Sequence, residues 1–217
     1  MTNPFTSSQL IDLGIKNYEN TLLFQRKIHS LRRENKIPDT FIIVEHSPGI
    51  YTIGRNSKKE NFPGIDPVVV ERGGDVTYHG PGQIILYPIV RVFEQYNSMD
   101  IPLFVKNMEG IITDALENMG FETHFGDEPG IWVSNSPDGD RKVCSVGMKI
   151  REGVSFHGIS INYSKEVLQG FMKIRPCGLD PQIMGYLGVE KGEVIENIIR
   201  SIKKRYEKLE IKKEDDF

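Results

Sequence analysis

The sequence predicts an α+β domain with a mixed, mostly antiparallel sheet and flanking helices. Three stretches carry apolar residues at helical spacing, and the short runs between them are rich in β-branched and aromatic residues. The helices interrupt the strands too irregularly for repeated βαβ units, which argues against a parallel sheet. At about 100 to 200 residues per domain, 217 residues fit one domain over residues 1–217.

The three predicted helices cover about residues 18–33, 103–119 and 190–209. The second is followed by Gly120, the residue type expected just past a helix end. The third carries lysines and an arginine near its C-terminal end, where cations interact favourably with the helix dipole. We interpret these cations as a solvated face.

The predicted strands are short runs with β-branched and aromatic residues, at 40–44, 49–53, 67–70, 83–92, 130–133, 142–150 and 154–161. The last two flank a short glycine-containing turn at 151–153, which predicts a hairpin. Residues 134–141 read as a surface loop by composition, and the C-terminal tail 212–217 is expected to fray.

Composition and charge exclude several classes of protein. Hydrophobic residues make up 38% and charged residues 26%, as in ordinary globular proteins. The formal charge of −3 does not supply the long-range field with which nucleic-acid binders collect phosphates. The apolar runs are too short to span a membrane, and the N-terminus has no export signal. We therefore expect a cytoplasmic protein, with both cysteines reduced and without a membrane or nucleic-acid partner.

The densest chemical signal is the segment RGGDVTYHGPGQ at residues 72–83. Glycines let a backbone approach a ligand closely, and adjacent free N–H groups can bind a polar or anionic group. Arg72 and His79 add directed hydrogen-bond donors. The segment matches neither a phosphate-binding P-loop nor a dinucleotide fingerprint, so a nucleotide is not implied. A tight hairpin with a structural histidine remains the alternative.

A second signal is KVCSVG at residues 142–147, followed by SFHG at 155–158. Strand alternation points Lys142, Cys144 and Val146 to one face. On spacing alone, a single strand lysine is more often exposed to solvent than directed into a pocket. His157 is equally ambiguous, because a buried histidine is more often structural than catalytic.

The third signal is Cys177, held between Pro176 and Gly178. Proline fixes the backbone before the sulfur and glycine keeps the approach to it open, which suits a nucleophile. Cys144, between Val143 and Ser145 on a predicted strand, reads instead as a small core filler. The sequence has no CxxC or HxxxH spacing, so we expect no metal site.

Taken together, the motifs resemble one known family, the octanoyl transferases of lipoate biosynthesis. The resemblance rests on EHSPGIYTIGR from Glu45, RGGDVTYHGPGQ, RKVCSVGMKIREGVSFHGISIN and RPCGLD from Arg175 to Asp180, which occur in that order. It implies the α+β fold shared with the catalytic domains of lipoate and biotin protein ligases, and no cofactor.

The resemblance also implies roles for individual residues. Cys177 corresponds to the nucleophile that carries the acyl thioester, and Lys142 to the lysine that activates its thiol. The substrate pocket maps onto Arg72, Gly73, Gly74, Asp75, Val76, Thr77, Tyr78, His79, Ser145, Val146, Gly147, Gly158, Ile159 and Ser160.

The chemistry of a thiol agrees with these roles. A free cysteine has a pKa near 8.5, so only about 3% is thiolate at pH 7. An ammonium at about 4 Å attracts a thiolate by about 4 kcal/mol at an effective dielectric constant near 20. Lys142 could therefore ionise Cys177. Lys142 or His79 could later accept the proton of the acceptor amine, and backbone N–H groups could stabilise the oxyanion.

The implied reaction moves an octanoyl group from octanoyl-acyl carrier protein to a lysine of a lipoyl domain. Acceptors would be the lipoyl domains of 2-oxoacid dehydrogenases and the glycine cleavage H protein. Val146 and Ile159 are expected to line an apolar tunnel for the acyl chain. Two alternatives stay open: an ATP-dependent lipoate-protein ligase on the same scaffold, and a non-catalytic module that binds acylated carriers.

Overall fold

The computed structural model describes residues 7–92, 100–126 and 130–217. Its helices are α1 (Tyr18–Arg33), α3 (Ile101–Asn118), α4 (Leu168–Phe171) and α5 (Lys191–Arg205). The strands are β1 (Ser8–Lys16), β2 (Asp39–His46), β3 (Ile50–Ile53), β4 (Val68–Val69), β5 (Val76–His79), β6 (Gln83–Ile89), β7 (Thr123–His124), β8 (Gly130–Ser136), β9 (Gly139–Arg151), β10 (Val154–Asn162) and β11 (Leu209–Lys212). Three short 3₁₀ turns matter below: η1 (Lys59–Asn61), η3 (Pro176–Gly178) and η4 (Pro181–Ile183).

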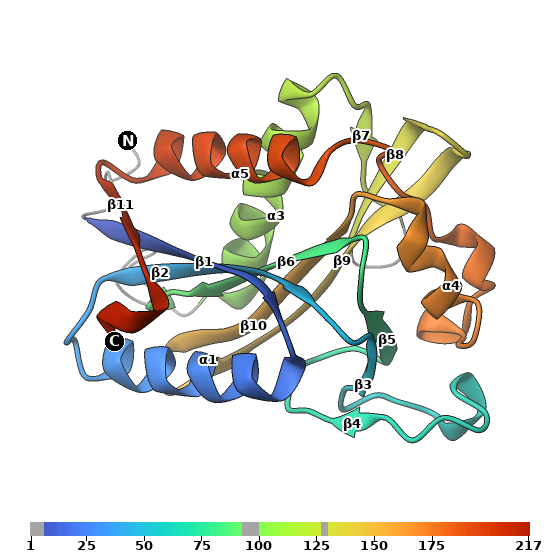
Figure 1. Cartoon of the computed structure of the whole chain (residues 1–217), viewed down its shortest axis with the longest axis horizontal. Helices are drawn as coiled ribbons and strands as arrows, with labels where there is room; N and C mark the ends of the chain where they lie inside the picture. The colour runs from blue at the N-terminus through green and yellow to red at the C-terminus, as the bar shows by residue number, and fades with distance from the viewer. Residues whose placement is uncertain (1–6, 93–99, 127–129) are drawn as a thin grey trace.

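Within the described ranges, the strands form a large and a small sheet. The large sheet has eight strands in the order β11-β1-β2-β6-β10-β9-β8-β7, and the small sheet has the order β4-β3-β5. In the large sheet, β1 pairs in parallel with β2 and β11, and the remaining neighbours are antiparallel. Helix α1 covers one face and α5 lies on the other side, with α3 behind the strands (Figure 1). The predicted α+β class with a mostly antiparallel mixed sheet is confirmed.

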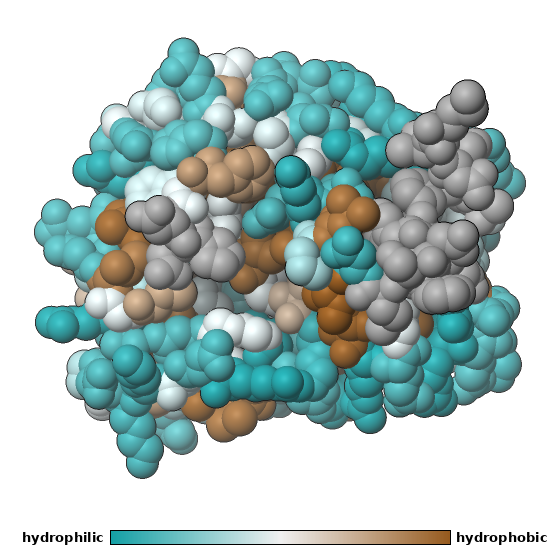
Figure 2. Space-filling view, turned by 180° about the vertical axis from the view of Figure 1, so that it is seen from behind, coloured by the Kyte–Doolittle hydropathy of each residue, from teal (hydrophilic) through white to brown (hydrophobic). Residues whose placement is uncertain are grey.

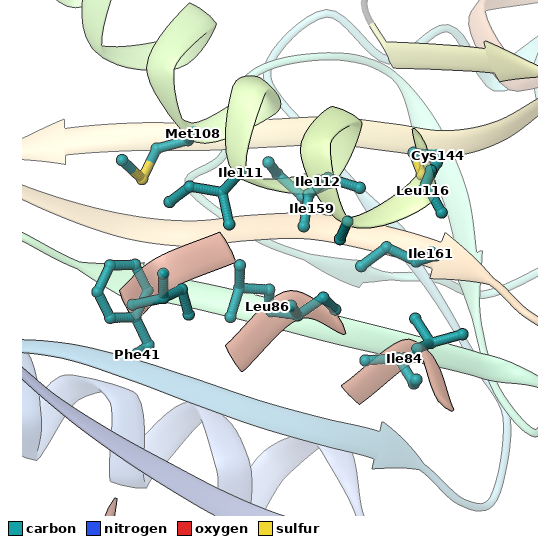
Figure 3. Close-up of a cluster of buried hydrophobic side chains, with 14 of the residues drawn as sticks. Phe41, Ile84, Leu86, Met108, Ile111, Ile112, Leu116, Cys144, Ile159 and Ile161 are labelled. Atoms are coloured by element: carbon teal, nitrogen blue, oxygen red, sulfur yellow. The ribbon is translucent and has the colours of Figure 1, made fainter. Parts of the chain in front are cut away.

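The main hydrophobic core lies between the large sheet and helices α3 and α5. Met108, Ile111 and Ile112 of α3 point toward Leu86 and Ile159 of the sheet (Figure 3). A second cluster packs α1 against the opposite face. Each strand side chain that faces a helix therefore leaves water, at about 25 cal/mol per Å² of apolar surface.

Cys144 belongs to the main core. Its side chain is fully buried beside α3 (Figure 3), and this burial raises the pKa of its thiol. The prediction that Cys144 is a small core filler is confirmed.

Several sequence predictions about strands, the third helix, the tail and one loop were wrong. Strands β1, β5, β7 and β11 were not predicted: β1 lacks a clear apolar–polar alternation, β5 lies in the glycine-rich segment, and β7 and β11 are short. The third helix ends at Arg205, and Leu209, the last residue of its predicted range, begins β11. The tail is ordered: Glu214–Asp216 forms a 3₁₀ turn and the Phe217 ring packs edge-on against Phe24. Residues 134–141 form the end of β8, a tight turn and the start of β9.

The hairpin predicted at 151–153 is confirmed. Arg151 pairs with Val154, and Glu152 and Gly153 at the turn both have positive φ. This is the conformation of a two-residue turn that matches the twist of antiparallel strands.

The surface seen from behind is largely hydrophilic, and apolar side chains gather in its central part (Figure 2). In the described ranges, no helix combines the length and apolar character needed to cross a bilayer.

Gly158 of β10 is required for the close approach of β10 to β6. A Cβ atom at this position would lie 1.9 Å from the carbonyl oxygen of Leu86, which is backbone and cannot rotate away. We expect Gly158→Ala to lower the free energy of unfolding by about 3 kcal/mol, because the strands must separate. Urea unfolding followed by circular dichroism measures this change.

Gly192→Ala in α5 is the matched control. No atom lies within 4 Å of a Cβ built there, so we expect stability to stay constant or to rise by up to about 1 kcal/mol. Equal unfolding midpoints for the two variants would contradict the packing argument.

Candidate active site

A single cavity of about 780 Å³ brings together the three sequence signals. Its floor is the face of β9 and β10 that carries Ser145, Gly147, Gly158 and Ser160. These residues oppose one another in register, Ser145 with Ser160 and Gly147 with Gly158, so their small side chains lie on one face. The cavity exists because this part of the sheet has almost no side-chain volume above it.

The glycine-rich loop forms one wall of the cavity. Arg72 is buried and donates to the carbonyl oxygen of Gly73 at 2.9 Å and to the carbonyl oxygen of Thr52 at 2.8 Å. The amide of Gly73 donates to the carbonyl oxygen of Met148 at 3.3 Å, beyond the point where β8 stops pairing with β9. Arg72 thus holds the loop between the small sheet and the edge of the large one.

Burial dominates the electrostatics of Arg72. Desolvation lowers the pKa of its guanidinium, and negative charge at Tyr18, Asp75 or Cys177 would oppose that shift. Arg72 therefore lies within electrostatic reach of the Cys177 sulfur as well as of the loop it anchors.

Cys177 lies on a tight turn at the mouth of the cavity. Its backbone has φ 56° and ψ 22°, and Gly178 follows with φ 79°, so two successive residues are left-handed. For a residue with a Cβ this conformation costs about 1–2 kcal/mol, and such conformations cluster at functional sites. Cys177 is exposed and lines the cavity, whereas Cys144 is buried in the core. The turn presents this sulfur to an incoming molecule.

Lys142 also lines the cavity, and the prediction from spacing that it faces solvent was wrong. Only 5% of the residue is exposed. The pairing of β8 with β9 shifts between Ile131 and Trp132: Ile131 pairs with Cys144, but Trp132 pairs with Lys142, which leaves Val143 as an extra residue. Simple alternation places Lys142 and Cys144 on the same face of β9. The β-bulge turns Lys142 away from that face.

Gly130 leaves space for the Lys142 side chain. A Cβ at Gly130 would lie 2.6 Å from Cε of Lys142 and 2.3 Å from the carbonyl oxygen of Cys144. The lysine stem therefore runs directly over the backbone at the start of β8.

The turns that follow Cys177 connect it to the strand of Lys142. Met184 forms a parallel bridge with Lys142, and the amide of Gly185 donates to the carbonyl oxygen of Lys142 at 2.9 Å. Although 35 positions separate Lys142 from Cys177 in the sequence, both residues face one cavity.

The inner part of the cavity carries polar aromatic groups from α1, β5, β6 and β10, namely Tyr18, His79, Tyr87 and His157. Burial lowers the pKa of His79 to about 3 and that of His157 to about 3, so both imidazoles are neutral at pH 7. Burial raises the pKa of Tyr18 to about 12. Apolar side chains also line the cavity, among them Val76, Ile85, Val105 and Val146.

A chain of hydrogen bonds fixes the tautomer of His79. Asn162 Nδ2 donates to the carbonyl oxygen of Gly185 at 2.9 Å, which makes Asn162 Oδ1 the acceptor for Gln83 Nε2 at 2.8 Å. Gln83 Oε1 is then the acceptor for His79 Nδ1 at 2.8 Å. The proton of neutral His79 therefore lies on Nδ1, and Nε2 carries a lone pair.

The structure places most of the predicted pocket residues around this cavity. Those that line it are Arg72, Gly73, Gly74, Asp75, Val76, Thr77, His79, Ser145, Val146, Gly147, Gly158 and Ser160.

Tyr78 and Ile159 do not line the cavity. Ile159 pairs with Leu86 on the opposite face of the sheet and packs under α3 (Figure 3). The Tyr78 ring lies where Cβ atoms of Gly49, Gly80 and Gly170 would be, and it contacts Tyr51 and Phe171. Tyr78 therefore joins the small sheet to α4.

Comparison with known proteins identifies the family. Residues 17–211 match the lipoyl protein ligase A/B catalytic domain. The chain belongs to this family. It is also 35% identical over 200 residues to a probable octanoyltransferase 2 of Picrophilus torridus, covering 88% of this chain and 76% of the relative. An octanoyltransferase of Dictyoglomus turgidum is 40% identical over 172 residues, which cover 75% and 68% of the two chains. The resemblance to octanoyl transferases is confirmed.

Solved structures of lipoate and biotin ligases share the fold. A crystal structure of lipoate-protein ligase A bound with ATP aligns with a TM-score of 0.74 at 14% identity, over 95% of this chain and 88% of that one. A biotin acetyl coenzyme A carboxylase synthetase of Helicobacter pylori aligns with a TM-score of 0.51 at 10% identity, over 91% and 74%. The predicted likeness to lipoate and biotin ligase domains is confirmed at the level of the fold.

Several residues that line the cavity were not predicted from the sequence. Tyr18 and Tyr87 sit in helix and strand patterns that indicate only packing, and Asn61 lies in a segment without a strong pattern. His157 was left ambiguous; in the structure it lines the cavity with φ 61°. No pattern in the sequence predicted that Met184 and Gly185, which follow the cysteine motif, would contact Lys142.

The hydrogen-bond chain makes a testable prediction about His79. We expect ¹⁵N NMR of histidine-labelled protein to show His79 protonated on Nδ1 and unprotonated on Nε2 between pH 5 and pH 8, since its pKa of about 3 lies below that range. Gln83→Glu should raise the pKa of His79, because a carboxylate stabilises the imidazolium.

Gln9→Glu is the control, since Gln9 is also a buried glutamine but bonds to Thr40 on β2. The His79 signals should not move in this variant. An Nε2-protonated His79 in the wild type would refute the assigned chain.

Proposed function

We propose that this chain transfers an octanoyl group from octanoyl-acyl carrier protein to a specific lysine of lipoyl domains, through a thioester on Cys177. The chain is an acyltransferase, as its octanoyltransferase relatives indicate. The observation that carries the finer proposal is an exposed cysteine on a left-handed turn, at the mouth of a cavity that Lys142 also lines.

The first half-reaction exchanges one thioester for another. The Cys177 thiolate attacks the acyl carbonyl carbon, a new C–S bond forms, the bond to the carrier sulfur breaks, and the carrier thiolate leaves and takes a proton from the Lys142 ammonium. Two thioesters are similar in energy, so no ATP is consumed. The ammonium of Lys142 would favour the thiolate electrostatically, and Arg72 adds a second positive charge within reach of the sulfur.

The second half-reaction forms an amide. The neutral ε-amine of the acceptor lysine attacks the acyl carbon, the C–S bond breaks, and the amine loses a proton. His79 is a poor acceptor for that proton because burial lowers its pKa to about 3. We therefore assign this proton to Lys142, which is a neutral amine once it has protonated the leaving carrier thiolate and becomes an ammonium again as Cys177 leaves as a thiolate.

The main alternative is an ATP-dependent lipoate-protein ligase on the same scaffold. The solved ligase with ATP is only 14% identical, so its likeness extends to the fold and not to the reaction. An adenylating enzyme needs no thiol at the cavity mouth, and the strained Cys177 turn therefore favours the transferase. The same turn argues against a non-catalytic carrier-binding module.

Intact-mass spectrometry after mixing with octanoyl-acyl carrier protein tests the proposal. We expect one octanoyl adduct on the wild-type chain without ATP, and none on Cys177→Ala. Cys144→Ala is the control: it removes the buried thiol and should still be loaded. An adduct on Cys177→Ala, or a reaction that requires ATP, would reject the thioester mechanism.

The rim of the cavity carries more exposed cations than carboxylates, with Glu60 the acidic residue beside Lys58, and this excess of positive charge fits an acidic donor. Lys58 and Arg175 line the mouth beside Cys177, and Lys59 follows Lys58; all three are exposed. In the described part of the chain, none of these three forms an ion pair with a carboxylate. By contrast, Arg32 and Arg33 on α1 pair with Asp39 and Glu152. Unpaired cations around a mouth accelerate encounter with an acidic partner.

Charge reversal at the rim tests the donor. We expect Lys58→Glu with Lys59→Glu to slow loading from the acyl carrier protein by about tenfold at low salt, and less at 0.5 M salt, because salt screens exposed charges. The rate of loading over a salt series measures this.

Lys203→Glu with Lys204→Glu is the matched control, because it makes the same charge change on exposed residues of α5 outside the cavity lining. Equal slowing in both double variants would indicate a net-charge effect and would remove the argument for docking at the rim.

A further inference from the structure

Asn61 lies where the turn of Cys177 meets the glycine-rich loop. It ends turn η1, is 5% exposed and lines the cavity. Its backbone carbonyl oxygen accepts from the amide of Arg175 at 2.8 Å, and its side-chain Nδ2 donates to Asp75 Oδ2. One residue therefore contacts two segments that are about a hundred positions apart in the sequence.

The side-chain bond has a fixed direction. A carboxylate only accepts hydrogen bonds, so the amide nitrogen of Asn61 must face Asp75. The other oxygen of Asp75 accepts from the amide of Val76 at 2.7 Å, which aligns the carboxylate with the start of β5. The amide of Asn61 lies over Gly178: a Cβ built there would be 3.9 Å from both Oδ1 and Nδ2.

The Cys177 turn packs against β5 and η1 with Pro176 buried, whereas most backbone amides of this segment in the described structure bond within the segment itself. The amides of Gly178 and Leu179 bond to Arg175 and Pro176 at 3.0 Å, within the turn itself. Those of Ile183 and Met184 likewise bond within their own turn, to Asp180 and Pro181. The backbone bonds that tie this segment to other elements lie at its two ends, from Arg175 to Asn61 and from Gly185 to Lys142.

We propose that Asn61 is the positioning residue of Cys177. A left-handed cysteine persists only where its surroundings hold it, because the conformation is unfavourable by itself. Asn61 restrains the residues just before Cys177, because it bonds both to the amide of Arg175 and to the carboxylate of Asp75. The sulfur therefore keeps its position relative to the wall of the cavity. The inference rests on the proposed role of Cys177 as the nucleophile.

Asn61→Asp tests the role with almost no change in shape. The backbone carbonyl stays, but the donor is lost and two carboxylates face each other. We expect the rate of Cys177 loading by octanoyl-acyl carrier protein to fall about 10- to 100-fold, since a small misplacement of a reacting group has effects of that size. The apparent affinity for the donor should change much less.

The double variant Asn61→Asp with Asp75→Asn restores one donor and one acceptor in reversed order. The oxygen of an asparagine at 75 can still accept from Val76, and the total charge is that of the wild type. We expect this swap to recover most of the loading rate. Recovery would show that the hydrogen bond between positions 61 and 75 is required, and not the native residue at either position by itself.

Asn197→Asp is the matched control. Asn197 is a buried asparagine of α5 whose Nδ2 donates to the carbonyl oxygen of Glu193 at 2.9 Å, and it does not line the cavity. Its loading rate should equal that of the wild type. Hydrogen exchange adds a structural readout: amides 175–179 should exchange faster in Asn61→Asp and return to wild-type rates in the swap.

The outcomes separate this inference from the proposed function. Absence of an adduct on wild-type Cys177 defeats the proposed function. Loading in the wild type combined with equally fast loading in Asn61→Asp overturns the role of Asn61, as does a swap that loads as slowly as the single variant. Should Asn61→Asp fail to fold, a swap that folds and loads at close to the wild-type rate supports the role of Asn61, and a swap that folds but loads slowly overturns it.

Discussion

The hydrogen bond between the amide of Gly185 and the carbonyl of Lys142 is the contact on which the candidate site depends. It attaches the segment that follows Cys177 to β9, next to the bulge at Val143 that turns the lysine side chain toward the cavity. The carbonyl of the same glycine accepts from Asn162 and so begins the chain that ends at His79. One short stretch of backbone thus orders the lysine strand, the cysteine segment and the histidine together.

The two faces of the large sheet have different roles: one packs against the hydrophobic core, and the other lines the cavity. Under α3, the strands present large apolar residues such as Leu86 and Ile159, and burial there stabilises the fold. On the other face, β9 and β10 present serine and glycine, which leave open the volume of the cavity. Side chains that filled this space would add buried apolar area and remove the site. The open cavity forgoes stabilising contacts on this face of the sheet, and the hydrophobic core on the other face supplies the stability.

Burial also shapes the chemistry available in the cavity. Histidines 46, 79 and 157 are buried, and their pKa values of about 4, 3 and 3 keep them neutral. Nε2 of His157 and Nε of Arg72 find no partner within the described structure. The charged side chains that line the cavity are Arg72, Asp75 and Lys142, together with Lys58, Glu60 and Arg175.

The sequence by itself determined the fold class, the extent of α1, the hairpin at 151–153 and the contrast between the two cysteines. Those features follow from local periodicity and from residue types, which act over a few positions. Most of the pocket residues followed from the motif order. The orientation of Lys142 did not, because a bulge shifts alternation by one residue and depends on how β8 pairs with β9. Asn61, Tyr18 and Tyr87 had no local signal, since each belongs to the cavity only through a distant partner. Tertiary structure alone decided which side chains share the cavity, because the contacts that assemble it join segments far apart in the chain.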